Sequence, residues 1–150
     1  MPDPDDFHFH HHVDVRFKDV DIGGHAHHSH ALVYMEEARA AYWREVVGRS
    51  DLSDVDYILA EARIRYHQRV LYPQRLRVAV RVARLGKRHF EMDYEVRGAE
   101  RELLVSGTTT QVMYDYAAGG TKPVPDEVRR AVEARDGPFG PGGRPRADTS

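Results

Sequence analysis

The chain has 150 residues, of which 41% are hydrophobic and 31% are charged, and its net charge is −2. These values fit one soluble globular domain and give no general electrostatic attraction to nucleic acid. The absence of cysteine excludes disulfides, cysteine nucleophiles and thiolate metal sites, and it fits a cytoplasmic protein. We also expect no signal peptide and no membrane-spanning segment, because no apolar run approaches the required length.

The N-terminal part alternates between apolar and polar residues. Between Phe7 and Phe17 every second position is apolar except His11, and the intervening positions are polar. This period of two is typical of a half-buried strand. Residues 1–10 are therefore expected to form an extension and the start of this strand, with the folded domain running over residues 11–136.

A long apolar helix is predicted from Ser29 to Val47. No proline interrupts it, Ser29 is a suitable N-cap, and Gly48 is suited to the position after the helix. At helical spacing, one face carries Leu32, Met35, Tyr42, Trp43 and Val46. Arg39 lies within this face, and we expect it to reach the surface, to pair with a carboxylate, or to anchor a carboxylate of the site.

Most of the remaining chain shows strand patterns. The predicted strands cover Ile58–His67, Arg75–Arg84, His89–Arg97 and Glu102–Tyr114, with Gly98 in a hairpin turn. A short surface helix is predicted over residues 126–135. Residues 137–150 are rich in glycine and proline, so we expect a disordered tail.

This order of elements predicts the fold class. Strands joined by short turns are antiparallel, and one long apolar helix must be covered by their common face. The expected class is α+β, a curved antiparallel β-sheet wrapped around one long central α-helix. The edge strands and the opposite sheet face still need protection, which favours a symmetric homo-oligomer.

The segment before the helix carries the strongest chemical signal. Free N–H groups of a first helical turn lie at the positive end of the helix dipole and suit an oxyanion. Asp19 and Asp21 lie just upstream, followed by a flexible Gly-Gly pair. One aspartate can face the site while the other holds the turn. Alternatively, both aspartates cap turns.

A histidine run in the same segment allows a second interpretation. It comprises His25, His27, His28 and His30. Metal binding is one reading, and polar side chains around the mouth of a cleft are the other. The usual zinc spacings are missing, so we expect no metal.

Two stretches of this sequence resemble a known family. They are Arg16-Phe-Lys-Asp-Val-Asp-Ile-Gly-Gly-His25 and Tyr34-Met-Glu-Glu-Ala-Arg39. They resemble the signature of the 4-hydroxybenzoyl-CoA thioesterase family, which includes the YbgC-like acyl-CoA thioesterases. The resemblance covers about residues 11–135 and implies the hotdog fold. It also implies hydrolysis of acyl-CoA without a separate cofactor, in dimers or tetramers whose sheets join and whose sites lie between subunits.

The resemblance also implies roles for the residues of the turn. The second aspartate of the family attacks the thioester or activates water, and it corresponds to Asp21. A backbone N–H near the helix start holds the oxyanion, which corresponds to the N–H of His28. Gly24 and His25 belong to the same catalytic turn. Many members of the family carry asparagines where this chain has His27 and His28, so the lining of the acyl pocket is expected to differ.

Further residues are expected to bind the substrate. The family binds the CoA phosphates with basic residues on a later strand or turn, which here corresponds to Lys87 and Arg88. The alternative for this pair is an ordinary solvated hairpin. Tyr34 and Glu37 are expected to line the pocket.

Two other functions fit the same pattern of residues. One is a hotdog dehydratase acting on 3-hydroxyacyl thioesters, with His25 paired with Asp21, although its usual His-Phe-Pro-Gly-His segment is missing. The other is a non-catalytic acyl-CoA-binding module. Such a sensor usually carries a DNA-binding segment, and the sequence contains no helix-turn-helix or basic arm.

Overall fold

The computed structural model describes residues 6–49, 51 and 55–144. Within them, one antiparallel sheet has the strand order β1-β3-β4-β5-β2, and β6 pairs with the end of β5. The strands are β1 (His10–Asp14), β2 (Tyr57–Tyr66), β3 (Arg75–Leu85), β4 (His89–Arg97), β5 (Leu103–Asp115) and β6 (Gly120–Thr121). The edges of the main sheet are therefore β1 and β2.

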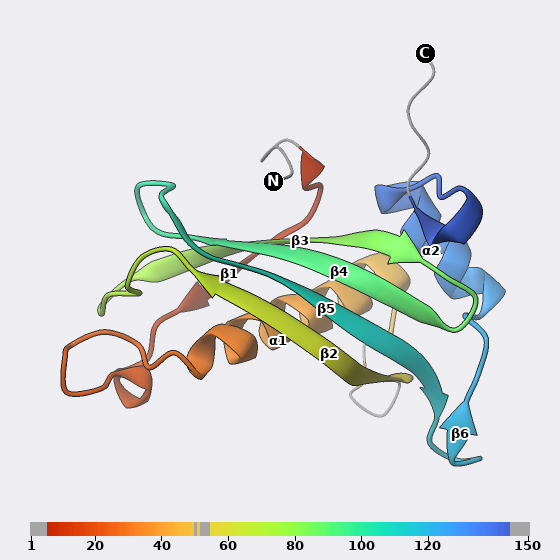
Figure 1. Ribbon diagram of the computed structural model, residues 1–150, viewed down its shortest axis with the longest axis horizontal. Helices are drawn as coiled ribbons and strands as arrows, with labels where there is room; N and C mark the ends of the chain where they lie inside the picture. Colours follow the sequence, from red (N-terminus) through yellow and green to blue (C-terminus); the bar gives the residue numbers. More distant parts are fainter. Residues whose placement is uncertain (1–5, 50, 52–54, 145–150) are drawn as a thin grey trace.

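The sheet curves over one long helix, as Figure 1 shows. Helix α1 (His30–Tyr42) packs against β3 and β1 and continues as a π-helical turn over Trp43–Val47. Helix α2 (Asp126–Asp136) lies at one end of the sheet and contacts β3. This arrangement confirms the expected α+β architecture and the hotdog fold.

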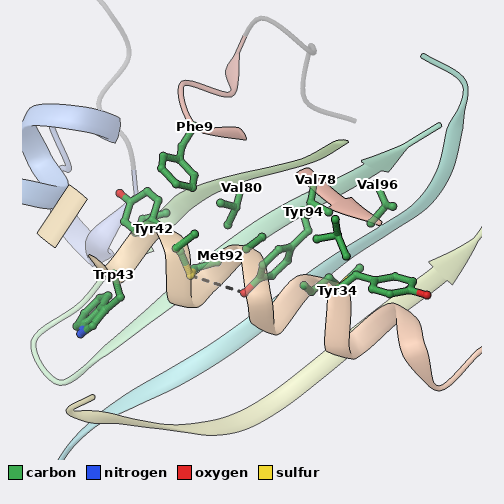
Figure 2. Packing of buried hydrophobic residues seen from close by; sticks show 14 of the residues in the cluster. Phe9, Tyr34, Tyr42, Trp43, Val78, Val80, Met92, Tyr94 and Val96 are labelled. Atoms are coloured by element: carbon green, nitrogen blue, oxygen red, sulfur yellow. Dashed lines mark hydrogen bonds between the residues drawn. The ribbon is translucent and has the colours of Figure 1, made fainter. Parts of the chain in front are cut away.

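The core fills the space between α1 and the sheet (Figure 2). Large side chains of the helix, such as Tyr42 and Trp43, meet the inward-facing residues of β3 and β4. The Trp43 ring stacks on Phe90 with the ring centres 5.2 Å apart. Burial of these apolar side chains, each worth about 1.5–3 kcal/mol, holds the helix against the sheet.

The first strand is shorter than the sequence predicted. Only His10–Asp14 pair with β3, and the chain then turns into a 3-10 helix over Phe17–Asp19. Phe17, expected on the buried face, is 80% exposed. The apolar alternation continues past the strand, but the turn that leads to Asp19 rotates Phe17 away from the core.

The long helix begins and ends close to the predicted residues. Gly48 has a φ of +88° and ends the helix in the left-handed conformation, as expected. Ser29 does not cap the helix through its side chain, because its hydroxyl contacts the His27 ring instead. Leu32, which was expected on the buried face, is only partly buried.

Arg39 fits none of the roles predicted for it. Its side chain is buried, and its Nη1 donates to the Tyr94 hydroxyl at 3.1 Å. The guanidinium also lies 5.7 Å from the centre of the Tyr57 ring. No carboxylate pairs with Arg39 in the part of the chain that the structure describes. Aromatic hydroxyls and a ring face therefore take the place of the expected anion.

The later elements match their predicted positions closely, with one difference in topology. Strand β2 does not pair with its neighbour in sequence, β3, but crosses to the other edge and pairs with β5. Except for Tyr57 and Ile64, its residues are exposed on both faces. One edge of the sheet therefore carries a long strand whose outer side is open.

The predicted disordered tail is wrong for its first residues. Residues 137–144 pack against the domain, where Phe139 contacts the core. Arg84 donates to the carbonyl of Gly142 at 2.6 Å, and residues Pro141–Gly143 form a 3-10 turn. The rest of the expected tail, residues 145–150, lies outside the described residues, as does the start of the expected extension, residues 1–5.

Candidate functional site

Asp19 is the buried anchor of the turn before α1. Its side chain is 2% exposed, and its Oδ2 accepts hydrogen bonds from the Arg16 N–H at 3.0 Å and the Tyr34 hydroxyl at 2.9 Å. The His30 ring lies 3.4 Å from Oδ1. Burial acts to raise the pKa of this carboxyl, but the hydrogen bonds from Arg16 and Tyr34 outweigh it and hold the pKa below its ordinary value.

Asp21 lies two residues further on and is accessible. Its side chain is 35% exposed, its Oδ1 accepts from the Gly23 N–H at 2.9 Å, and the Nδ1 of His25 lies 3.7 Å from the same oxygen. Its Oδ2 has no hydrogen-bond partner within the described residues. The two aspartates therefore differ as one alternative predicted: Asp19 holds the turn, while Asp21 both caps the turn and presents a free oxygen.

The glycine pair allows this geometry. Gly24 has a φ of +79°, a left-handed conformation that costs other residues about 1–2 kcal/mol. A side chain at Gly23 would lie 2.7 Å from the His25 ring and 3.3 Å from the Asp21 carboxylate. Glycine at both positions lets the backbone turn back while His25 packs over it.

The connection between β2 and β3 holds the returning chain. The N–H of Ala26 donates to the carbonyl of Val70 at 2.7 Å, and His25 pairs with Leu71. The N–H of His27 donates to the carbonyl of Asp19 at 2.9 Å. These bonds close the turn and bring it beside a distant part of the sequence.

The start of α1 presents a free donor. The N–H of His30 bonds to the carbonyl of His27, and the N–H of Ser29 bonds to the ring of His27. The N–H of His28 has no acceptor among the residues that the structure describes. The carbonyl of His28 accepts from the Tyr66 hydroxyl at 2.6 Å, which fixes the helix start to the end of β2.

These groups surround one cavity of about 360 Å³. The turn and the helix start form one wall, and the end of β2 with the connection after it forms the other. The lining residues are Asp21, His25, Ala26, His27, His28, Ala31, Tyr34, Tyr66, His67, Gln68, Arg69 and Val70. A carboxylate, a helix N-terminus and an apolar floor therefore meet in a volume suited to a small ligand.

The structure brings some predicted residues together and separates others. Asp21, His25, His28 and Tyr34 line the cavity, whereas Gly24 shapes the turn beside it. Glu37 forms a surface ion pair with Arg16 at 2.8 Å and does not line the cavity. Its predicted contact with the substrate stays a prediction.

The two residues expected to bind CoA, Lys87 and Arg88, lie away from the cavity that Asp21 lines. Lys87 and Arg88 occupy the hairpin between β3 and β4, which Figure 1 shows at the opposite end of the sheet from the turn before α1. Arg88 donates to the Thr121 hydroxyl at 3.3 Å. Within one chain, this pair does not meet Asp21.

The four histidines of the run lie in the turn and at the start of α1. Among the described residues, no three His, Asp or Glu side chains are grouped so that they hold an ion. His27 and His28 instead pack against one another, with their ring centres 4.0 Å apart. His25, His27 and His28 line the cavity, and both readings of the histidine run stay predictions.

Sequence reasoning missed the second wall of the cavity. Tyr66, His67, Gln68 and Arg69 lie about forty residues after the turn and carry no motif of their own. The pairing of Ala26 with Val70 and of His25 with Leu71, together with the bond from Tyr66 to His28, brings them close to Asp21. The polar run after a strand was the one available signal, and it is typical of many loops.

Comparison with known proteins decides the family. The model of the thioesterase-like superfamily matches residues 15–132. The chain belongs to the thioesterase-like superfamily. It is thus a thioester hydrolase, and this membership favours hydrolysis over dehydration and over a purely binding role. No curated protein sequence matches the chain significantly.

Solved structures agree with this membership. A thioesterase from Thermus thermophilus, complexed with coenzyme A and Zn, is 29% identical, with a TM-score of 0.77 over 87% of this chain and 95% of that one. A thioesterase superfamily protein from Jannaschia sp. CCS1 is 23% identical, with a TM-score of 0.81 and coverage of 90% and 96%. A 1,4-dihydroxy-2-naphthoyl-CoA thioesterase from Synechocystis is 23% identical, with a TM-score of 0.72 and coverage of 87% and 98%. The last two support the fold alone.

Across the described residues, no helix is both long enough and apolar enough to cross a bilayer.

Proposed function

We propose that this thioesterase hydrolyses acyl-CoA to a free acid and coenzyme A, with Asp21 as the nucleophile or the general base. One observation carries the proposal: Asp21 and His28, whose backbone N–H has no acceptor among the described residues, line the same cavity of about 360 Å³. The T. thermophilus relative complexed with coenzyme A supports the substrate class. The cysteine-free composition fits a cytoplasmic site of action.

The chemistry requires two groups on opposite sides of the thioester carbon. The carbonyl oxygen points at the His28 N–H, which donates to the negative charge that develops there. The free Oδ2 of Asp21 then attacks the carbon and expels the CoA thiolate, and water hydrolyses the resulting anhydride. Alternatively, Asp21 removes a proton from water, whose oxygen attacks while the thiolate leaves and is protonated.

The lining suggests a branch of the superfamily and an acyl site. The turn at Asp21, followed by the helix, supports a relationship to the 4-hydroxybenzoyl-CoA and YbgC-like thioesterases. Ala26, Ala31 and Val70 give the cavity an apolar floor, beside which the acyl group would lie. The release of free thiol from a panel of acyl-CoAs, aromatic and aliphatic, tests the activity and defines the acyl preference.

The active form in this proposal is a dimer joined through β2. The outer side of this strand is unpaired in one chain, and it exposes Ile58 and Leu59, by 37% and 38%. Such an edge normally pairs or is protected. A two-fold axis beside β2 would join two sheets antiparallel and place opposite ends of the two chains side by side. The partner's hairpin with Lys87 and Arg88 would then approach this chain's cavity.

Ile58→Lys is expected to weaken dimerisation by at least about tenfold, because the new charge would be buried between two β2 strands. Size-exclusion chromatography with light scattering, over a dilution series, measures the effect. Ala134→Lys adds the same charge to the exposed side of α2 and should leave the dimer intact. A monomeric wild type, or an Ile58→Lys dimer as stable as that of the wild type, would contradict this interface.

Tyr66→Phe is expected to lower kcat by about 3–10-fold with little change in KM. Its hydroxyl holds the carbonyl of His28, so its loss frees the helix start that presents the oxyanion donor. Steady-state kinetics on the best acyl-CoA measures the change. Tyr72→Phe is the matched control, because the hydroxyl of Tyr72 has no hydrogen bond in the described chain. Equal effects of the two variants would argue against a positioning role for Tyr66.

A further inference from the structure

A second cavity, of about 420 Å³, lies on the face of the sheet turned away from α1. Along β3, Leu76, Val78 and Val80 belong to the core, so the intervening Arg77 and Ala79 point to the outer face. Phe7, from the segment before β1, covers part of this face with its ring 5.3 Å from the Arg81 guanidinium. The sheet therefore separates this cavity from the one that contains Asp21.

The lining of this outer cavity is strongly basic. It includes Arg77, Arg97 and Arg101, with Glu95 as the one carboxylate among the lining residues. Three guanidinium groups and one carboxylate give a net charge of +2. His10 also lines the cavity, and burial followed by the charge of Arg77 lowers the pKa of His10, so its ring adds no charge at pH 7.

Two of these arginines are placed at an energetic cost. Arg77 on β3 lies directly opposite Arg97 on β4 in the antiparallel register. Like charges directly opposite one another destabilise a sheet. An anion bound between the two side chains would remove this repulsion.

The cavity also has a fixed part and a free part. Arg97 is held from two sides, because its Nη2 donates to Glu95 at 3.1 Å and its Nη1 donates to the carbonyl of Arg101 at 2.9 Å. Glu95 is 2% exposed, so a buried carboxylate orients the Arg97 guanidinium. The guanidinium groups of Arg77 and Arg101 have no hydrogen-bond or ion-pair partner within residues 6–49, 51 and 55–144. The unpaired guanidinium groups of Arg77 and Arg101 and the oriented guanidinium group of Arg97 thus line the same cavity.

We propose that this outer cavity binds a phosphate group carried by a small molecule of nucleotide size. Guanidinium groups match the oxygens of a phosphate in bidentate pairs, and a dianion balances the charge of +2. The volume exceeds that of a free phosphate, and Phe7 with Ala79 offers an apolar surface to the organic part. The phosphate can belong to a free nucleotide or to the nucleotide part of coenzyme A.

Isothermal titration of Asp21→Asn protein with ADP and with inorganic phosphate tests the binding directly, without turnover. We expect ADP to bind, and Arg77→Gln and Arg101→Gln each to weaken it by about tenfold or more. Arg75→Gln, on the same strand but outside the cavity, should change the affinity by less than about twofold. Absence of ADP binding, or an equal loss in Arg75→Gln, overturns the proposal.

A second measurement follows from the like-charge pair. Without ligand, Arg77→Gln should raise Tm by about 1–4 °C, because the repulsion with Arg97 is removed, whereas Arg75→Gln should not. Saturating ADP should raise the Tm of the wild type more than that of Arg77→Gln, and an equal rise in both contradicts the site.

A third measurement, the acyl-CoA KM of Arg101→Gln, distinguishes a free nucleotide from the nucleotide part of coenzyme A. An acyl-CoA KM that rises in Arg101→Gln in parallel with the loss of ADP affinity assigns the cavity to the nucleotide of the substrate. An unchanged KM assigns it to a free nucleotide. The ADP titration does not depend on thioesterase activity, so failure of the proposed function would leave it valid.

Discussion

Asp21→Asn is expected to lower the turnover of acyl-CoA by about 10²–10⁴-fold, the usual contribution of a positioned acid or base. The amide oxygen of asparagine still accepts the hydrogen bond from the Gly23 N–H, so the turn should persist. The substitution therefore removes the charge and nucleophilicity of the carboxylate while it keeps its shape. The measurement is thiol release from the preferred acyl-CoA, together with the thermal unfolding curve of each protein.

The matched control for this experiment is Asp14→Asn. The carboxylate of Asp14 is 79% exposed and lies 4.0 Å from the Arg75 guanidinium, outside the cavity. This variant should retain wild-type kcat and KM. A folded Asp21→Asn protein with normal turnover would exclude Asp21 as the catalytic group and would direct attention to the other polar residues of the cavity.

Asp19→Ala is expected to have the largest effect on stability, a loss of about 2–5 kcal/mol in the free energy of unfolding. The substitution leaves the buried Tyr34 hydroxyl and the partly buried Arg16 N–H without an acceptor. For a chain of this length the loss corresponds to a fall in Tm of about 4–20 °C. Urea unfolding and thermal unfolding both measure it.

The same carboxylate predicts how stability depends on pH. The pKa of Asp19 in the folded protein lies below its ordinary value of 3.8, so its stabilising effect is fully present above about pH 4. It is lost as the pH falls from that value through the depressed pKa. The difference in unfolding free energy between wild type and Asp19→Ala should therefore be largest near neutral pH and should narrow below pH 4.

A second variant at the same position, Asp14→Ala, provides the comparison for stability. An exposed carboxylate with a distant partner contributes at most about 1 kcal/mol, and its removal should change Tm by a few degrees at most. If Asp19→Ala proved as stable as Asp14→Ala, the carboxylate of Asp19 would not be the anchor of the turn.

The sequence alone predicted the elements and the position of the turn before α1 well. The period-two runs of β3, β4 and β5 and the apolar helix α1 depend on local spacing, which a single sequence displays directly. The turn before α1 was also local: two aspartates, two glycines and a helix start lie within a dozen residues. A local pattern of this kind predicts its own geometry, because a short chain segment can adopt few backbone conformations.

The parts that the sequence did not predict depend on contacts between distant segments. Strand β2 crosses to the far edge and pairs with β5, a pairing between distant segments that no local pattern records. Arg39 was expected to reach the surface or to meet a carboxylate, yet the packing of α1 on the sheet places it beside Tyr94 and Tyr57. Phe17 fitted the strand alternation, but the backbone turns before it and leaves it exposed.

The candidate site shows the same division between features set by local sequence and features set by long-range contacts. The sequence by itself determined which carboxylates, glycines and helix start come together, because they adjoin along the chain. Only the tertiary structure decided that Asp19 is buried and Asp21 accessible, since burial depends on Tyr34 reaching back from the helix. It also supplied the second wall from residues 66–70 and separated Lys87 and Arg88 from the turn. Chain neighbours are fixed by covalent distance, whereas the partners across a cavity are fixed by the packing of the whole sheet.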